Sequence, residues 1–172
     1  GEPDLVLRSR EMVVPAIGPD RWGDIGFVPT GLTVDRYVKA VEVREINDIA
    51  GDTASSTVGG RYVFHHMTYS SGVLNEEGTA VDEDTRTRWP IHEVGRNADI
   101  FPEKFGTILQ ANSALHLRAS HIHPNGIQET TAHLEFGFVF HPKGYQPEYG
   151  NRARVRLGNG TDIDVVGGRA GQ

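Results

Sequence analysis

The segment His133-Leu-Glu-Phe-Gly-Phe-Val-Phe140 decides the fold class of this 172-residue chain. Its large apolar residues stand at every second position: Leu134, Phe136, Phe138 and Phe140. Because successive side chains of a β-strand point to opposite faces, this alternation places all four on one face. The segment is therefore predicted to be a strand whose apolar face packs on the core.

The same period of two recurs in other parts of the chain. Val41 and Val43 alternate with charged residues, and so do Ala153, Val155 and Leu157. Turn signals rich in Gly, Pro and Asn separate the alternating runs, at residues 15–19, 51–60, 124–126 and 158–160. No apolar stripe of helical period extends over ten or more residues.

Short strands with this punctuation predict an all-β chain, folded as an antiparallel β-sandwich that resembles a jelly roll. The chain has the length of one well-cored domain. We assign residues 1–165 to that domain and the Gly-rich residues 166–172 to a tail or linker.

Composition excludes several classes of function. The formal net charge is −6, and there is no run of Lys or Arg, so nucleic acid and anionic membranes are poor candidate partners. The chain has no cysteine, which removes disulfides, cysteine-ligated metals and thiol catalysis. No apolar run approaches the ~18 residues of a membrane span, so we expect no transmembrane segment of its own.

Two groups of histidines are the strongest chemical signal. His121 and His123 lie two apart, which places their side chains ~7 Å apart on one face of a strand. By parity this is the face of Leu115, Leu117 and Ala119, so the two imidazoles are expected at the end of an apolar strip. Imidazole suits copper, zinc, iron and nickel, although surface or hydrogen-bonded histidines remain an alternative.

The adjacent pair His65-His66 raises a geometric problem. In a regular strand the two side chains point to opposite faces, so one packs in the core while the other faces water. A twist, a strand end or a β-bulge would allow both to approach one ion, and bulges do occur beside active sites. If such an irregularity is present, we predict a transition-metal site formed by His65, His66, His121 and His123.

The order of these motifs resembles a known family. Val63-Phe-His65-His66-Met67, followed by Leu115-His-Leu-Arg-Ala-Ser-His121-Ile-His123-Pro124, is similar to the N-terminal domain of copper type II, ascorbate-dependent monooxygenases, the peptidylglycine and dopamine β-monooxygenase family. The resemblance is closest to bacterial relatives that often follow a cytochrome c domain. It extends over nearly the whole chain, including the segments Gly1–Leu7, Val94–Glu103 and Phe140–Tyr145.

The resemblance implies one copper ion held by His65, His66 and His121, with His123 as a fourth candidate. It implies that this copper stores an electron and passes it to a second copper in a second domain, where a C–H bond is hydroxylated. We expect that domain to lie outside this chain, which then would not hydroxylate a substrate alone. A second copper domain or a larger complex is the implied partner, and the periplasm is the implied compartment.

Two alternatives stay open. Cupins also bind metals through an HxH motif, but Glu129 follows His123 by six positions rather than four or five. The chain could instead be a non-catalytic interaction subunit of a larger periplasmic or membrane-associated electron-transfer complex, with the metal site empty or vestigial. The sequence therefore leaves open whether the protein is an enzyme.

Overall fold

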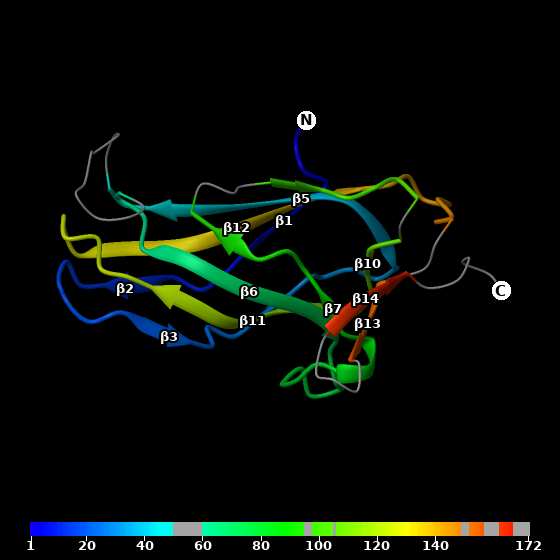
Figure 1. Cartoon of the computed structure of the whole chain (residues 1–172), viewed down its shortest axis with the longest axis horizontal. Helices are drawn as coiled ribbons and strands as arrows, with labels where there is room; N and C mark the ends of the chain where they lie inside the picture. Colours follow the sequence, from blue (N-terminus) through cyan, green and yellow to red (C-terminus); the bar gives the residue numbers. More distant parts are fainter. Residues whose placement is uncertain (50–59, 95–97, 105, 149–151, 157–161, 167–172) are drawn as a thin grey trace.

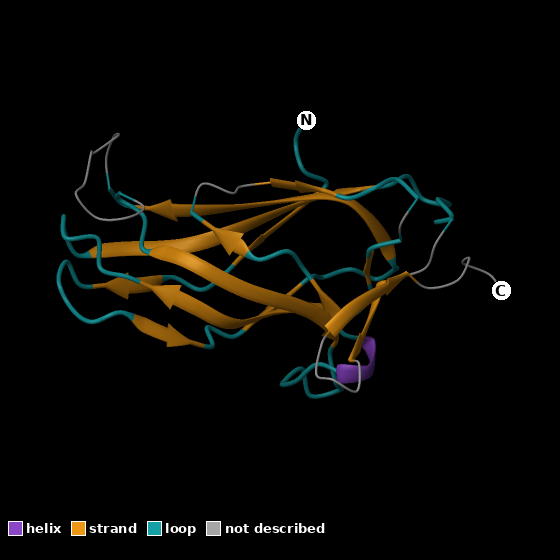
Figure 2. Ribbon diagram, in the orientation of Figure 1, coloured by secondary structure: helices purple, strands orange, loops and turns teal. Residues whose placement is uncertain are grey.

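The computed structural model describes residues 1–49, 60–94, 98–104 and 106–148, together with the backbone of 152–156 and 162–166. In these residues the regular structure is β-strand, apart from one short helical turn, Glu83–Thr85 (Figure 2). The predicted all-β class is confirmed. Over the same residues, no helix has the length and apolarity needed to cross a membrane.

Two six-stranded antiparallel sheets pack against each other (Figure 1). The first sheet contains β1 (Leu5–Arg8), β2 (Met12–Val14), β5 (Arg36–Asn47), β9 (Ala98–Ile100), β10 (Ile108–Leu109) and β12 (Thr130–Phe140). The second sheet contains β3 (Arg21–Gly23), β4 (Phe27–Pro29), β6 (Phe64–Val73), β7 (Thr87–Arg88), β8 (His92–Glu93) and β11 (Ser113–Ile122). The predicted single-domain antiparallel sandwich is confirmed, and its jelly-roll character stays a prediction.

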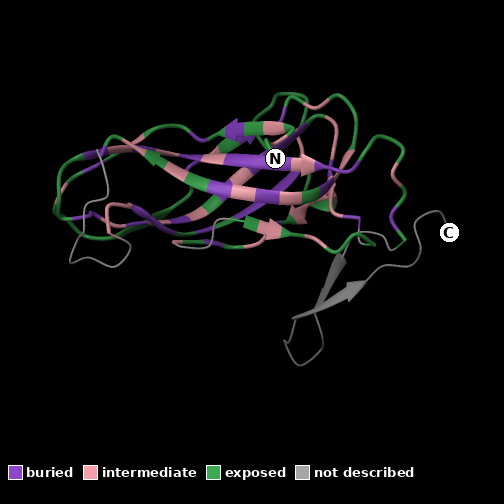
Figure 3. Cartoon of the chain, turned by 90° about the horizontal axis from the view of Figure 1, so that it is seen from above, coloured by how far each residue is buried: buried purple, intermediate pink, exposed green. Residues whose placement is uncertain are grey.

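The core lies between the two sheets, and β12 supplies its largest side chains. β12 pairs with β1 and β5, and its residues Leu134, Phe136 and Phe138 have 0% of their surface exposed. The neighbouring residues Val41 and Val43 of β5 are also buried. Along the long strands, buried positions alternate with more exposed ones (Figure 3). The alternation in the sequence therefore identified both strands and their inner faces correctly.

Glu45 links the first sheet to the start of β6 in the second. It continues the inner face of β5 beyond Val43, and its Oε1 accepts hydrogen bonds from the backbone N–H of Val63 at 3.0 Å and of Phe64 at 2.7 Å. Burial raises the pKa of the Glu45 carboxyl, and these hydrogen bonds oppose that rise. The beginning of β6, directly before His65, is thus held by a side chain of the opposite sheet.

The chain turns at residues 124–126, as predicted. The Asn125 side chain accepts from Ile127 N at 3.0 Å and donates to Arg61 O at 3.0 Å, and Gly126 has a positive φ of 75°. This turn anchors the segment that follows β11.

A hairpin of β13 (Arg152–Arg156) and β14 (Asp162–Val166) follows the sandwich in sequence. The predicted apolar face of Ala153, Val155 and Leu157 lies outside the described side chains. Val166, where the tail was expected to begin, is the last residue of β14. The rest of the predicted tail, residues 167–172, lies outside the described residues, and so do the predicted turn at 158–160 and all of the predicted turn at 51–60 except Gly60.

Candidate metal centre

A β-bulge in β6 solves the geometric problem of the adjacent histidines. His66 lies opposite His121 of β11, but the next pair is Phe64 opposite Ile122, so His65 is the extra residue on β6. His66 is exposed, whereas Phe64 and His65 are both buried, His65 with 8% of its surface exposed. The bulge therefore allows two consecutive histidines to lie near the same residue of β11.

A second irregularity, in β11, reverses the predicted face of His121 and His123. Between the pairs His116–Ser70 and Ala119–Thr68, β11 advances three residues while β6 advances two. Leu115 and Leu117 face the core before this bulge, and Ser120 and Ile122 are buried after it. The prediction that the two histidines continue the apolar face is wrong. They lie on the outer face of the second sheet, where solvent and other side chains can reach them.

Four histidine rings gather at the bulge in β6. His66 and His121 are nearly parallel, with ring centroids 5.7 Å apart and Nδ1 atoms 3.5 Å apart. The His65 ring lies 5.5 Å from that of His121 and 4.8 Å from that of His123. All four residues that the sequence singled out are thus brought together.

His65 is the buried member of this group. Its Nε2 is inaccessible to solvent and has no hydrogen-bond partner. Burial lowers the pKa of His65, and the neighbouring His123 and His121 lower it further, while a hydrogen bond to the Tyr62 backbone acts in the opposite direction. A neutral imidazole with an unpaired buried nitrogen is the form that binds metal ions.

Asp20 joins the site from the segment before β3. Its Oδ2 lies 2.7 Å from His121 Nε2, and its Oδ1 contacts His123 Nδ1. Hydrogen bonds with His121 and then His123 lower the pKa of the Asp20 carboxyl, so it is ionised at neutral pH. This residue was not among the predicted ligands. Its position directly after the predicted turn at 15–19 was a signal, but its partners lie about a hundred residues away.

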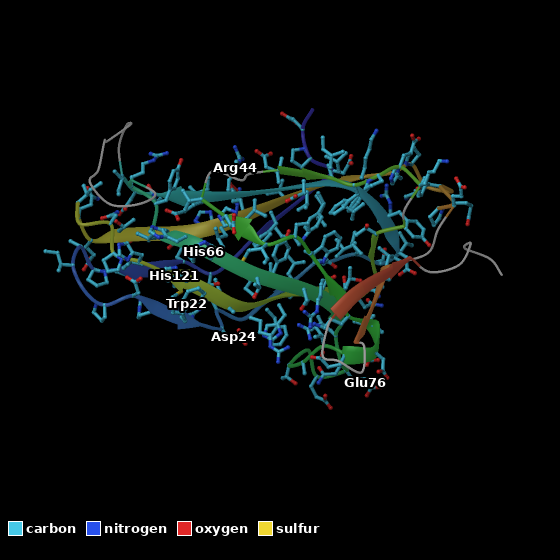
Figure 4. The ribbon with its side chains drawn as sticks, viewed as in Figure 1. Trp22, Asp24, Arg44, His66, Glu76 and His121 are labelled. Carbon is cyan, nitrogen blue, oxygen red and sulfur yellow. The ribbon has the colours of Figure 1, made fainter. Side chains whose placement is uncertain are left out.

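Trp22 covers one face of His121. The two residues are paired across β3 and β11, their ring centroids are 4.3 Å apart, and the ring planes differ by 2°. Figure 4 shows Trp22, His121 and His66 beside one another on three adjacent strands. Trp22 nevertheless has 65% of its surface exposed, so the stack restrains the His121 ring while the other face of the indole meets solvent.

His121 therefore stands between two groups of donor atoms. On the Nδ1 side of His121, the Nδ1 atom of His66 lies 3.5 Å away. Two nitrogens that bind one ion at ~2.0–2.1 Å in tetrahedral geometry are ~3.3–3.4 Å apart, which is close to this distance. On its Nε2 side are Asp20 and His123, and the ligand atoms of these three residues lie within 4.8 Å of one another. The second group thus brings three ligand atoms together, whereas the first has two, and the ring of His65, its third candidate, lies 5.5 Å from that of His121.

One similar pair, on the same sheet, lies apart from this cluster. His116 Nε2 is 2.6 Å from Asp24 Oδ2, and the Phe27 ring stacks on His116 at 4.2 Å. With only one imidazole and one carboxylate, this pair offers fewer donors than a metal site requires. It is therefore a matched control for the cluster.

Comparisons with family models, curated proteins and solved structures found no match to this chain. The resemblance to copper monooxygenases thus rests on the sequence motifs alone.

Proposed function

We propose that this domain binds one copper ion through His65, His66 and His121. The observation that carries the proposal is the pair of facing Nδ1 atoms of His66 and His121, 3.5 Å apart, together with the His65 ring, whose centroid lies 5.5 Å from that of His121 and whose buried Nε2 has no partner. Two strands and a bulge hold these rings, and His65 must approach the pair on binding, because the ligand atoms of the three residues do not all lie within 4.8 Å of one another. The motifs shared with copper monooxygenases favour the same three residues.

Copper supplies electron storage to such a site, because an all-imidazole donor set accommodates both Cu(I) and Cu(II). The residues of this chain supply the position, orientation and shielding of the ligands. The two strands hold His66 and His121 at ligand spacing, Trp22 restrains the plane of His121, and the core side of the bulge keeps water from His65. We propose that the domain transfers electrons, in the periplasm, to a second copper domain or to a larger complex.

The test is copper binding by the double variant His65→Ala/His66→Ala. Wild-type protein purified without added metal chelators should contain one copper per chain and, after oxidation, give a type II electron paramagnetic resonance spectrum with nitrogen ligands. The double variant should lose this copper and keep its β-sheet circular dichroism. A His133→Ala variant, which removes an imidazole from the outer face of the first sheet, should keep it. Stoichiometric copper in the double variant would contradict the proposal.

A second candidate is an interaction subunit of a larger complex, with the metal site unused. Two apolar residues near the cluster favour it, since Ile17 and Trp22 have 85% and 65% of their surfaces exposed. Extraction in mild detergent followed by size-exclusion chromatography distinguishes the candidates. Co-elution with a stable set of partners and no bound copper supports the subunit, and elution alone removes its basis.

A further inference from the structure

We propose that Asp20, His121 and His123 form a second cation position, selective for a divalent ion such as Zn²⁺ and sharing His121 with the copper position. The inference rests on the proposed function only in that the two positions share this ring. The His121-x-His123 motif supplies two of its ligands, and the fold adds Asp20 from about a hundred residues away. The second position follows from where the two nitrogens of His121 point.

The geometry of the second position is that of three converging ligands. Asp20 presents one carboxylate oxygen to each ring, at 2.7 Å from His121 Nε2 and in direct contact with His123 Nδ1. An ion between these atoms would replace the protons that now form the two hydrogen bonds. Among the described residues this is the one group of three His, Asp or Glu side chains whose ligand atoms all lie within 4.8 Å of one another.

Solvent access completes the coordination of a divalent ion. The side chain of Asp20 is 42% exposed and that of His123 is 31% exposed, so water can reach the fourth ligand position. Three protein ligands and a water molecule satisfy the tetrahedral preference of Zn²⁺. The proposed copper position, by contrast, has no carboxylate; the ring of His65, which we assign to it, lies 5.5 Å from that of His121 and 4.8 Å from that of His123.

The two positions differ in the ions they prefer. The copper position offers imidazole nitrogens alone, which suits Cu(I), whereas a carboxylate oxygen adds negative charge and favours a harder divalent ion. A neutral imidazole has one lone pair and one N–H. When His121 binds an ion through Nε2, its proton lies on Nδ1, which then cannot bind copper. Occupation of one position therefore weakens the other.

The test compares the affinities for Zn²⁺ and Cu(I) across single variants. Zn²⁺ is measured by isothermal titration calorimetry, and Cu(I) by competition with a chromophoric chelator. Asp20→Asn and His123→Ala should weaken Zn²⁺ binding more than about 100-fold, beyond the loss expected from removal of an outer-shell partner. Cu(I) binding should fall less than about 10-fold in both, and in Asp20→Asn the amide oxygen still accepts the His121 Nε2–H bond.

The reciprocal variant and the control make the test specific. His66→Ala should lose Cu(I) and retain Zn²⁺, and His121→Ala should lose both ions. Asp24→Asn, which alters the matched His116 pair, should change neither affinity. In wild-type protein one equivalent of Zn²⁺ should lower the apparent Cu(I) affinity, and in His123→Ala it should not.

Two results would overturn the second position. One is a wild-type protein that takes up no Zn²⁺. The other is an equal loss of Cu(I) and Zn²⁺ in Asp20→Asn and in His123→Ala, because these residues would then only orient His121. Unchanged Cu(I) binding in His66→Ala would instead refute the copper assignment and leave the Zn²⁺ result to be judged by itself.

Discussion

Replacing Glu45 with alanine should destabilise the domain and weaken the proposed copper site together. Glu45 is the side chain of the first sheet that holds the start of β6, directly before the histidine pair. Its carboxylate accepts hydrogen bonds from the N–H groups of Val63 and Phe64, and from Asn47 Nδ2 at 2.7 Å. Alanine removes all three acceptor contacts and offers nothing in their place.

The magnitude follows from the groups left without a partner. Phe64 is fully buried and Val63 has 0% of its surface exposed, so their two N–H donors cannot turn to bulk water. An unsatisfied buried donor costs about 1–3 kcal/mol, which gives about 2–6 kcal/mol for the pair. Asn47 Nδ2 keeps Arg61 O as a second, longer contact at 3.4 Å and adds little. For a domain whose total stability is about 5–15 kcal/mol, this loss is large.

Glu45→Gln is the informative second variant, because its Oε1 can keep both backbone hydrogen bonds. It should lose less stability than Glu45→Ala, because its weaker neutral hydrogen bonds are offset by the removal of a buried charge. Copper affinity should fall about 10–100-fold in Glu45→Ala, as for loss of an outer-shell support, and less in Glu45→Gln.

Urea denaturation at pH 7 measures the stability, and competition with a chromophoric chelator measures the Cu(I) affinity. Glu42→Ala is the matched control: it is a glutamate of the same strand on the outer face, and its loss should cost at most about 0.5 kcal/mol. If Glu45→Ala costs less than about 1 kcal/mol, the link between the sheets does not stabilise the fold. If it destabilises the protein but leaves Cu(I) affinity unchanged, the start of β6 does not position the histidines.

Two further predictions concern buried polar groups. Because the pKa of Glu45 is raised, the folded protein keeps the proton of this carboxyl group to a higher pH than the unfolded chain does. The free energy of unfolding should therefore decline as the pH rises from 4.5 through the folded-state pKa. Urea titrations across this range should show the decline in wild-type protein and lack it in Glu45→Gln; the same slope in both would assign it to other groups. Ser71→Ala should cost about 1–3 kcal/mol, because it leaves the buried Trp89 Nε1–H, now 2.9 Å from Ser71 Oγ, without that acceptor. Thermal unfolding measures this loss, and an unchanged midpoint would show that another group satisfies the indole.

The sequence by itself determined the fold class and the inner faces of the strands. Alternation is a local property, so Leu134, Phe136 and Phe138 could be placed in the core without knowledge of any partner strand. The same holds for Val41 and Val43. The type and number of imidazoles also predicted a transition-metal site, because ligand preference depends strongly on the residue type.

Only the tertiary structure decided how the histidines meet. A β-bulge depends on the register between two strands. The strands β6 and β11 are about fifty residues apart in sequence, and the packing of the sandwich sets their register. Parity counted along β11 alone therefore placed His121 and His123 on the wrong face. One extra residue in a strand is enough to exchange its two faces.

The role of Asp20 in the site also depends on strand pairing and could not be predicted from the sequence. A carboxylate beside a predicted turn is common, and its meaning arises only when β3 pairs with β11 and brings it 2.7 Å from His121. Hydrogen bonds and metal ligation act over a few ångströms in space, whatever the separation along the chain. For this protein, local alternation of residues specified the sandwich, and the pairing of strands distant in sequence specified the candidate metal centre.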